Sequence, residues 1–293
     1  MRDWWLDAIA GSNWDVVLDI RGNHILGGWV FIQASKYGIP YLCNAALSPY
    51  QGVFYCYPED LSRKNRISFE NQVLSNLYSL LPKTPYIHQT LYPGNNNLLQ
   101  LIWAGFSVQF RYTYMLNDLS NTDRLWNQIH PRARRTIQKF EDKDDIHITE
   151  SDNPKTVYDL HSKSMANQEK RTQLSFDSFR RLDQALNQRN CRKIYVGKDK
   201  NGRDLGAIYV VWSENRAYYL LGGVDRAEIQ SNMNVFLLWH AIRDLSSRVL
   251  SFDFEGSMLP GVERIFRYFG AEQIVYPEIK KYKFPLNLIK IWK

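Results

Sequence analysis

The pattern of hydrophobic and polar positions is most regular between residues 205 and 281. Apolar runs at 205–212 and 217–223 flank a short polar turn, which predicts two adjacent strands. Residues 231–248 predict a helix, and strands are expected at 251–256 and 272–281, before and after a short helix. One face of the long helix is apolar at the three-and-four spacing of a buried stripe: Val235, Leu238, Trp239, Ile242 and Leu245. Strand, helix and strand in this order predict parallel pairing with a right-handed crossover.

The first half of the chain shows a similar order of elements. Residues 22–32 are similar to residues 202–212, and the segment 98–106 is similar to 262–270 in its order of helix, glycine and strand. We infer two copies of one α/β unit. A basic amphipathic helix over 122–143, interrupted or kinked by Pro131, lies between them. We therefore expect domains at 1–145 and 146–293.

Composition narrows the protein class. The chain has 293 residues, a net charge of +7 and a hydrophobic fraction of 44%, which suit a globular α/β protein. Cys43, Cys56 and Cys191 are odd in number and form no metal-binding or disulfide spacing, which favours a reducing compartment. No apolar run is long enough to cross a bilayer and no signal peptide is recognised at the N-terminus, so the expected location is the cytoplasm.

Four segments carry a resemblance to a known superfamily: Tyr218–Asp225, Leu237–Ile242, Phe252–Ser257 and Pro260–Gly270. They resemble the donor-binding half of GNAT-type acyltransferases. Their sequences are more similar to the FemABX-like branch, which adds amino acids to peptidoglycan precursors. The resemblance implies an α/β fold with two GNAT-like mixed-sheet domains in tandem. It also implies an N-acyltransferase whose co-substrate is an acyl-CoA or an aminoacyl-tRNA.

The donor site is expected where the strand 217–223 meets the start of the long helix. Free backbone N–H groups and the helix dipole favour a phosphate or carboxylate there. The expected donor-binding residues are Leu221, Gly222, Gly223, Gln230, Ser231 and Asn232. Gln230 matches the first position of a GNAT pyrophosphate loop, whereas Met233 and Val235 replace its small residues, which predicts weak binding of acetyl-CoA. The alternative is a capped core helix without a ligand.

Asp253 and Glu255 are the candidate catalytic residues. Strand alternation places both carboxylates on one face, at the end of an inner parallel strand, where side chains face a crevice. A carboxylate with a suitably tuned pKa can take a proton from an attacking amine. The alternative is a structural role, in which the carboxylates pair with Arg264 or Arg267 or cap the helix that begins at Pro260.

Arg134, Arg135 and Lys139 are the candidate acceptor-binding residues. The sequence Arg134–Lys139 resembles a basic Arg-x-x-Ile-x-Lys helix that FemABX-like enzymes carry between their domains. Arginine pairs well with phosphate and carboxylate, so the expected acceptor is an anionic amine, either a small molecule or one linked to a nucleotide or lipid. The alternative is a solvated helix face that is balanced by the acidic residues 141–145.

The sequence therefore favours direct transfer of an acyl or aminoacyl group to an amine, in a cleft between the domains. Backbone N–H groups near Leu221–Gly223 would stabilise the oxyanion. No metal or permanently bound cofactor is expected, and the oligomeric state stays open. The main alternative is a non-catalytic binding protein on the same fold, since a fold does not guarantee chemistry. An RNA-binding role rests only on charge and aromatic residues.

Overall fold

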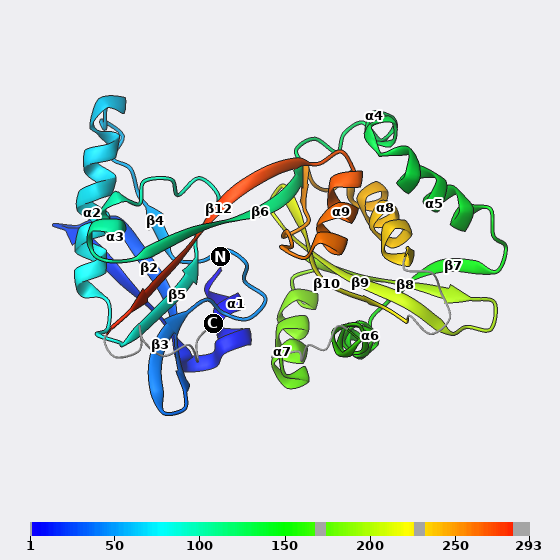
Figure 1. The fold of residues 1–293 in the computed structure, drawn as a ribbon, viewed down its shortest axis with the longest axis horizontal. Coiled ribbons are helices and arrows are strands. Elements are labelled where there is room, and N and C mark those ends of the chain that lie inside the picture. The colour runs from blue at the N-terminus through cyan, green and yellow to red at the C-terminus, as the bar shows by residue number, and fades with distance from the viewer. Residues whose placement is uncertain (1, 168–173, 226–231, 284–293) are drawn as a thin grey trace. The chain divides into compact units, whose positions relative to one another are not determined.

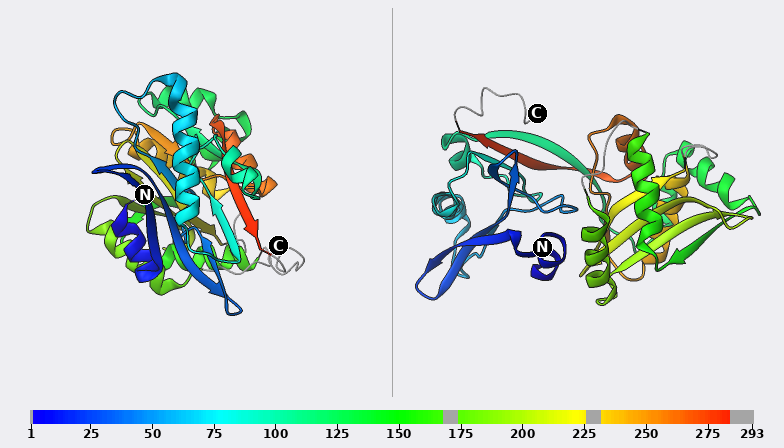
Figure 2. Two further views of the ribbon diagram at one scale, coloured as in Figure 1. Left: turned by 90° about the vertical axis from the view of Figure 1, so that its left-hand side faces the viewer. Right: turned by 90° about the horizontal axis from the view of Figure 1, so that it is seen from below.

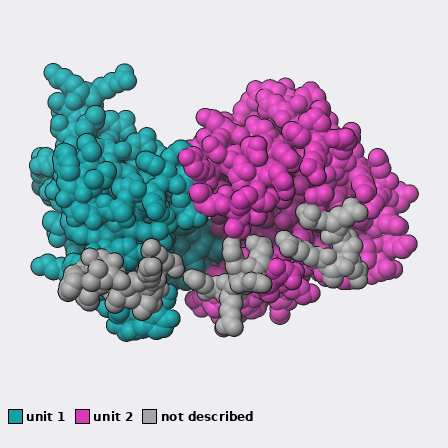
Figure 3. Space-filling view, in the orientation of Figure 1, with its two compact units in different colours: residues 1–111, 275–293 teal, residues 112–274 magenta. Residues whose placement is uncertain are grey.

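The computed structural model describes residues 2–167, 174–225 and 232–283. The chain forms two compact units (Figures 1 and 3). Unit 1 comprises residues 1–111 and 275–293, and unit 2 comprises residues 112–274. Each unit is described by itself below.

Unit 1 is a mixed sheet with strand order β1-β2-β3-β5-β12, in which β4 pairs with β2. β3 and β5 are parallel, and β12 joins β5 in the antiparallel sense. The helices are α1 (Asp3–Ala10), α2 (Arg66–Leu80) and α3 (Leu99–Trp103), with 3₁₀ turns η1 (Gly11–Asn13) and η2 (Arg63–Asn65). The strands are β1 (Trp14–Arg21), β2 (His24–Lys36), β3 (Ile39–Cys43), β4 (Val53–Tyr55), β5 (Tyr86–Thr90), the first half of β6 (Ser107–Leu116) and most of β12 (Glu272–Tyr282).

The core of unit 1 lies between α2 and the sheet. The buried face of α2 supplies Val73, Leu74 and Leu77, which recur at helical spacing. These side chains belong to the same apolar cluster as Trp29 and Phe31 of β2. Trp29 donates its indole N–H to Gln89 on β5 over 2.6 Å, so the buried polar tip of this side chain is satisfied.

Unit 2 has the strand order β6-β11-β10-β9-β8-β7. Figures 1 and 2 show helices on both faces of this sheet, with α6 and α7 on one face and α8 and α9 on the other. The strands are β7 (Ile146–Ser151), β8 (Arg192–Asp199), β9 (Asp204–Ser213), β10 (Arg216–Val224) and β11 (Ser251–Asp253). The helices are α4 (Thr122–Gln128), α5 (Pro131–Glu141), α6 (Pro154–Ala166), α7 (Phe176–Asn187), α8 (Met233–Leu245) and α9 (Pro260–Tyr268).

The helix α8 is the centre of the core of unit 2. The predicted stripe from Val235 to Leu245 is buried, as expected for a crossover helix between the parallel strands β10 and β11. The basic helix α5 packs against it, with the ring of Phe140 stacked on Phe236 at a centroid distance of 5.3 Å. The predicted interruption at Pro131 is confirmed: the chain forms two helices, α4 and α5, and Pro131 is the first residue of the second one.

The two copies that the sequence suggests have the same order of elements. The series β1, β2, β3, α2, β5, α3, β6 corresponds to β8, β9, β10, α8, β11, α9, β12, apart from β4, which lies between β3 and α2 in the first series alone. The last strand of each series pairs outside its own series, because β6 joins β11 and β12 joins β5. The compact units therefore do not coincide with the expected limits of 1–145 and 146–293, which remain our proposal for the extent of the two sequence copies. Within the described ranges, no helix has the length and apolar character that a membrane span requires.

Candidate active site

A pocket opens in unit 2 where two parallel strands separate. β10 and β11 pair only over three positions, from Arg216 with Ser251 to Tyr218 with Asp253. Beyond that point β10 continues to Val224, whereas β11 ends. The register of β10 also shifts around Leu220, where a bulge changes the direction of the strand. The resulting pocket has a volume of about 810 Å³ and lies within unit 2 alone.

Glu255 enters this pocket from a strained turn. Its φ is 57° and that of Gly256 is 70°, so two consecutive residues adopt the left-handed conformation. A side chain at Gly256 would place its Cβ 2.1 Å from the carbonyl oxygen of Tyr112, so only glycine fits there. Strand alternation therefore does not reach Glu255, and the expectation that it shares a face with Asp253 is wrong. Strain of this kind is characteristic of functional sites.

Asp253 lies in the core and does not line the pocket. Its side chain is fully buried, and Oδ1 accepts hydrogen bonds from the Thr113 hydroxyl at 2.6 Å and from the Glu255 N–H at 2.8 Å. Arg267, one of the two arginines considered as its partner, binds Glu263 at 3.0 Å. The structure thus gives Asp253 a defined contact: it holds the backbone of Glu255 in the turn.

The Glu255 carboxyl has an unusual environment. It is half-buried, and burial followed by the nearby charge of Asp253 raises its pKa well above the ordinary range. The hydroxyl of Tyr219 lies in the same pocket, and burial, with a further contribution from Glu255, also raises the pKa of Tyr219. The phenol therefore keeps its proton at neutral pH, and the carboxyl binds its proton more tightly than an exposed glutamate does. Shifted groups that converge in a cleft are typical of catalytic sites.

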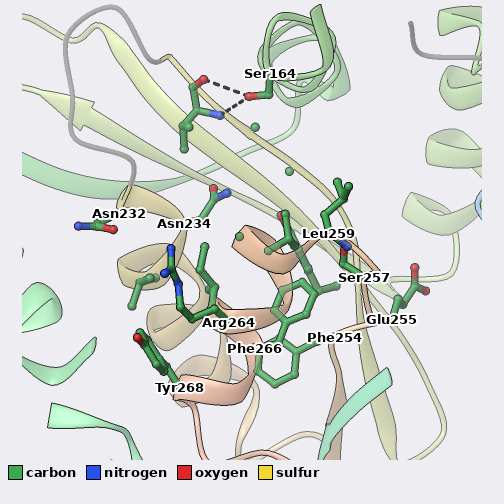
Figure 4. Close-up of a pocket in the computed structure, with 18 of the residues that line it drawn as sticks. Ser164, Asn232, Asn234, Phe254, Glu255, Ser257, Leu259, Arg264, Phe266 and Tyr268 are labelled. Atoms are coloured by element: carbon green, nitrogen blue, oxygen red, sulfur yellow. Dashed lines mark hydrogen bonds between the residues drawn. The ribbon is translucent and has the colours of Figure 1, made fainter. Parts of the chain in front are cut away.

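The helix α6 is fixed against the end of β10 that extends beyond its pairing with β11. The Ser164 hydroxyl accepts from the Val224 N–H at 3.0 Å and donates to the Val224 carbonyl at 3.1 Å, as Figure 4 shows. His161 Nδ1 lies 3.1 Å from the Gly222 carbonyl oxygen. The approach is so close that a Cβ at Gly223 would lie 2.3 Å from the backbone of Leu160. His161 and Ser164 of α6 therefore bond to backbone groups of β10 that would otherwise be available to pair with a further strand.

The opposite end of the pocket is cationic. Figure 4 shows Arg264 and Tyr268 on one side, Glu255 on the other, and the rings of Phe254 and Phe266 between them. Arg132 also lines this pocket. Within the part of the chain that the structure describes, neither the Arg132 nor the Arg264 guanidinium has an ion-pair partner. This end suits an anionic group of a ligand.

The predicted acceptor residues are divided by the structure. Arg135 and Lys139 line a second pocket of about 460 Å³ on α5, and this pocket shares Arg132, Thr136 and Asn232 with the first one. Arg135 and Lys139 therefore line a pocket that adjoins the pocket of Glu255. Arg134 lines neither of these two pockets.

The predicted donor residues mostly come together. Leu221, Gly222, Gly223 and Asn232 line the pocket of Glu255, whereas Gln230 and Ser231 lie outside the described residues. Met233 is fully buried, and its sulfur lies against Gly197 of β8. Its side chain therefore faces the sheet, and it does not crowd the pocket as the sequence suggested. Val235 does line the pocket.

The pocket also contains residues that the sequence does not assign to a site, among them His161, Tyr219 and Arg264. His161 lies on a helix without any motif, so nothing in its spacing indicates a site. Tyr219 lies two residues before Leu221, the first predicted donor residue, and the register of β10 shifts between these two residues, which alternation does not predict. Arg264 was considered only as a partner of the carboxylates.

Comparisons with known proteins agree with this geometry. Residues 130–267 match the family described as an acetyltransferase (GNAT) domain, which confirms the resemblance for the segment that forms the pocket. No curated protein matches the chain.

Solved structures extend the similarity to most of the chain. The crystal structure of FemX has a TM-score of 0.66 at 12% identity, over 94% of this chain and 90% of that one. A tandem GNAT protein from the clavulanic acid biosynthesis pathway has a TM-score of 0.56 at 11% identity, over 95% and 94%. The C-terminal domain of a putative lysylphosphatidylglycerol synthetase from Agrobacterium fabrum has a TM-score of 0.58 at 9% identity, over 95% and 88%. At these identities the similarity shows the fold alone, and the fold is that of tandem GNAT-like domains.

Proposed function

Because residues 130–267 match the GNAT acetyltransferase family and the fold is that of tandem GNAT proteins, we propose that this chain is an N-acyltransferase that acts in the pocket of unit 2. The observation that carries the proposal is the carboxyl of Glu255, presented by a strained turn at the point where β10 and β11 separate. Because its pKa is raised, this carboxyl binds a proton from an attacking amine more tightly than an exposed glutamate would.

The proposed reaction is direct transfer. Glu255 removes a proton from the acceptor's ammonium group, and the free amine attacks the carbonyl carbon of the donor. The Gly222 N–H is the proposed oxyanion donor: Val224 directs its N–H to the outer edge of β10, and alternate residues of a strand direct their backbone groups to the same edge. Asp253 is a positioning residue, since it bonds the backbone of Glu255 and not the substrate.

The proposed donor is an acyl-CoA, the co-substrate that the GNAT family uses, with aminoacyl-tRNA as the alternative. Arg132, Arg264 and the start of α8 form the end of the pocket where the anionic part of a donor fits. The proposed acceptor is an amine with an anionic group, held by Arg135 and Lys139 in the neighbouring pocket on α5. Arg134 lines neither pocket and does not belong to this proposed set.

A transfer assay tests the proposal. The purified protein is supplied with acyl-CoA or with charged tRNA, together with a panel of anionic amines, and amide products are detected by mass spectrometry. Replacing Glu255 by Gln should lower the transfer rate by about 10²–10⁴. Replacing the exposed Glu59 of unit 1 by Gln is the matched control and should leave the rate unchanged.

The same assay separates the alternative. A non-catalytic binding protein on this fold predicts donor binding by calorimetry without any amide product. Equal rates for the wild type and Glu255→Gln would remove Glu255 from the reaction while leaving the acyltransferase assignment in place.

A further inference from the structure

His161 presents one ring nitrogen to the pocket in a defined protonation state. Its Nδ1 lies 3.1 Å from the Gly222 carbonyl oxygen, and a carbonyl oxygen only accepts hydrogen bonds. Nδ1 therefore carries the hydrogen, and in the neutral ring Nε2 keeps its lone pair. Within the part of the chain that the structure describes, Nε2 has no hydrogen-bond or ion-pair partner, and His161 lines the pocket of Glu255.

The ring is held in this orientation by the seating of α6. Ser164, one turn further along the helix, makes two hydrogen bonds to Val224, and Gly223 allows the backbone of Leu160 to approach β10 closely. Burial lowers the pKa of His161, and the bond to Gly222 opposes this only in part. The imidazole is therefore neutral at pH 7, so Nε2 is a proton acceptor under ordinary conditions.

The proton balance of amide formation leaves a place for such a group. An ammonium nitrogen loses two protons on its way to an amide nitrogen, and Glu255 in the proposed reaction takes the first. Once protonated, that carboxyl cannot take the second proton, which leaves after the carbon–nitrogen bond has formed. The leaving sulfur or oxygen of the donor needs one proton when its bond to the acyl carbon breaks.

This inference rests on the proposed function. We propose that His161 Nε2 accepts the second proton and delivers it to the leaving group. The ring is bonded to Gly222, the same residue whose N–H is the proposed oxyanion donor, so it lies beside the reacting carbonyl. The steps balance: the acyl carbon exchanges its bond to sulfur or oxygen for a bond to nitrogen, and the leaving group departs protonated. His161 returns to its neutral form, and Glu255 releases its proton to water.

The variant His161→Asn separates this role from the seating of α6. The amide nitrogen of Asn can donate to the Gly222 carbonyl in place of Nδ1, but Asn has no group that replaces Nε2 as a base. Single-turnover transfer should fall by about 10²–10⁴, while the melting temperature and the donor affinity stay close to those of the wild type. Ser164→Ala is the control for the seating of α6. It should lower the stability, whereas its transfer rate should depend on the leaving group as the wild-type rate does.

The leaving group provides a readout that a structural role does not move. An aryl thiolate leaves without being protonated, whereas an alkyl thiolate is a poorer leaving group and needs a proton. The loss in His161→Asn should therefore be smaller with an aryl thioester donor than with an alkyl thioester donor. Added imidazole should restore part of the rate in His161→Ala. Equal losses with both donors, or full activity of His161→Asn, would overturn the proposal.

Two further results separate this inference from the proposed function. If the wild-type protein transfers the acyl group and the His161→Asn variant does so at the same rate, only the proposed role of His161 is contradicted. A wild-type protein that forms no amide sinks the proposed function and this inference with it. Nitrogen NMR of the labelled imidazole should find the proton on Nδ1 at pH 7, and a proton on Nε2 would contradict the assignment without any activity assay.

Discussion

Glu255 combines backbone strain with an unfavourable charge, so its removal should stabilise the fold. Burial and Asp253 raise its pKa, so the folded state binds this proton more tightly than the unfolded chain does. The stability that the protonated form provides is present at low pH and is lost as the pH rises through the raised pKa. We expect Glu255→Gln to melt at a higher temperature than the wild type at pH 8, with a smaller difference at pH 5.

Thermal melts at the two pH values check this prediction. Glu59→Gln, an exposed substitution, should not alter the melting temperature by more than a surface change usually does. A Glu255→Gln variant that is less stable at pH 8 would indicate that the carboxylate makes a stabilising contact. A site that is costly to the fold is expected where function retains the residue.

At the scale of single elements, the seating of α6 on β10 depends on Gly223. A Cβ at this position would lie 2.3 Å from the backbone carbon and oxygen of Leu160, and backbone atoms cannot rotate away. We expect Gly223→Ala to displace α6, to break the bonds of His161 and Ser164, and to lower the free energy of unfolding by about 1–3 kcal/mol. Chemical denaturation measures the change. Gly261→Ala, where a Cβ meets nothing within 4 Å, should have little effect on stability.

The strand β12 is anchored in unit 1 by a nearly buried carboxylate. The hydrogen bond with His88 lowers the pKa of Glu278 to about 2, and Lys280 and Arg111 act in the same direction. The ordinary value is 4.5. A depressed pKa contributes stability above pH 4.5 that is lost as the pH falls from there toward 2.

Acid titration of Glu278→Gln tests this anchor. At pH 7 the variant should be less stable by an amount on the order of 2–3 kcal/mol, because removing one partner strands the cations beside it. Near pH 2 the two proteins should be equally stable. A constant difference across the whole range would mean that packing, and not charge, accounts for the effect.

The sequence is informative about elements and less so about the site. Apolar spacing predicts α8 and the strands β9, β10 and β12, because periodic burial leaves a direct trace in residue type. The position of Glu255 depends on the end of β11 at Asp253 and on two left-handed residues, which alternation cannot show. The direction of the Met233 side chain cannot be read from the sequence either, because a buried side chain and a pocket-lining side chain occupy neighbouring positions of one helix turn. The role of Gly223 becomes visible only when α6 is in place.

At the scale of the whole molecule, the exchange of last strands determines what can fold by itself. The strand β11 pairs with β6, through Phe252 with Leu116, and β5 pairs with β12, through Gln89 with Ile279. A cut at residue 145 therefore leaves each sequence copy with a strand that belongs to the other sheet. The second fragment also loses α5, whose Ala133 and Ile137 are part of the core around α8.

We expect fragments 1–145 and 146–293, produced separately, to lack cooperative thermal unfolding. Each would expose an unpaired strand edge and part of an apolar core to water. In the second fragment Asp253 would also lose the Thr113 hydroxyl and remain a buried carboxylate with one partner fewer. Co-expression of the two fragments should restore a folded complex with a single transition, since every pairing is then available. If either fragment melted cooperatively alone, the two copies would be independent domains, and the exchanged strands would be attached to cores that do not require them.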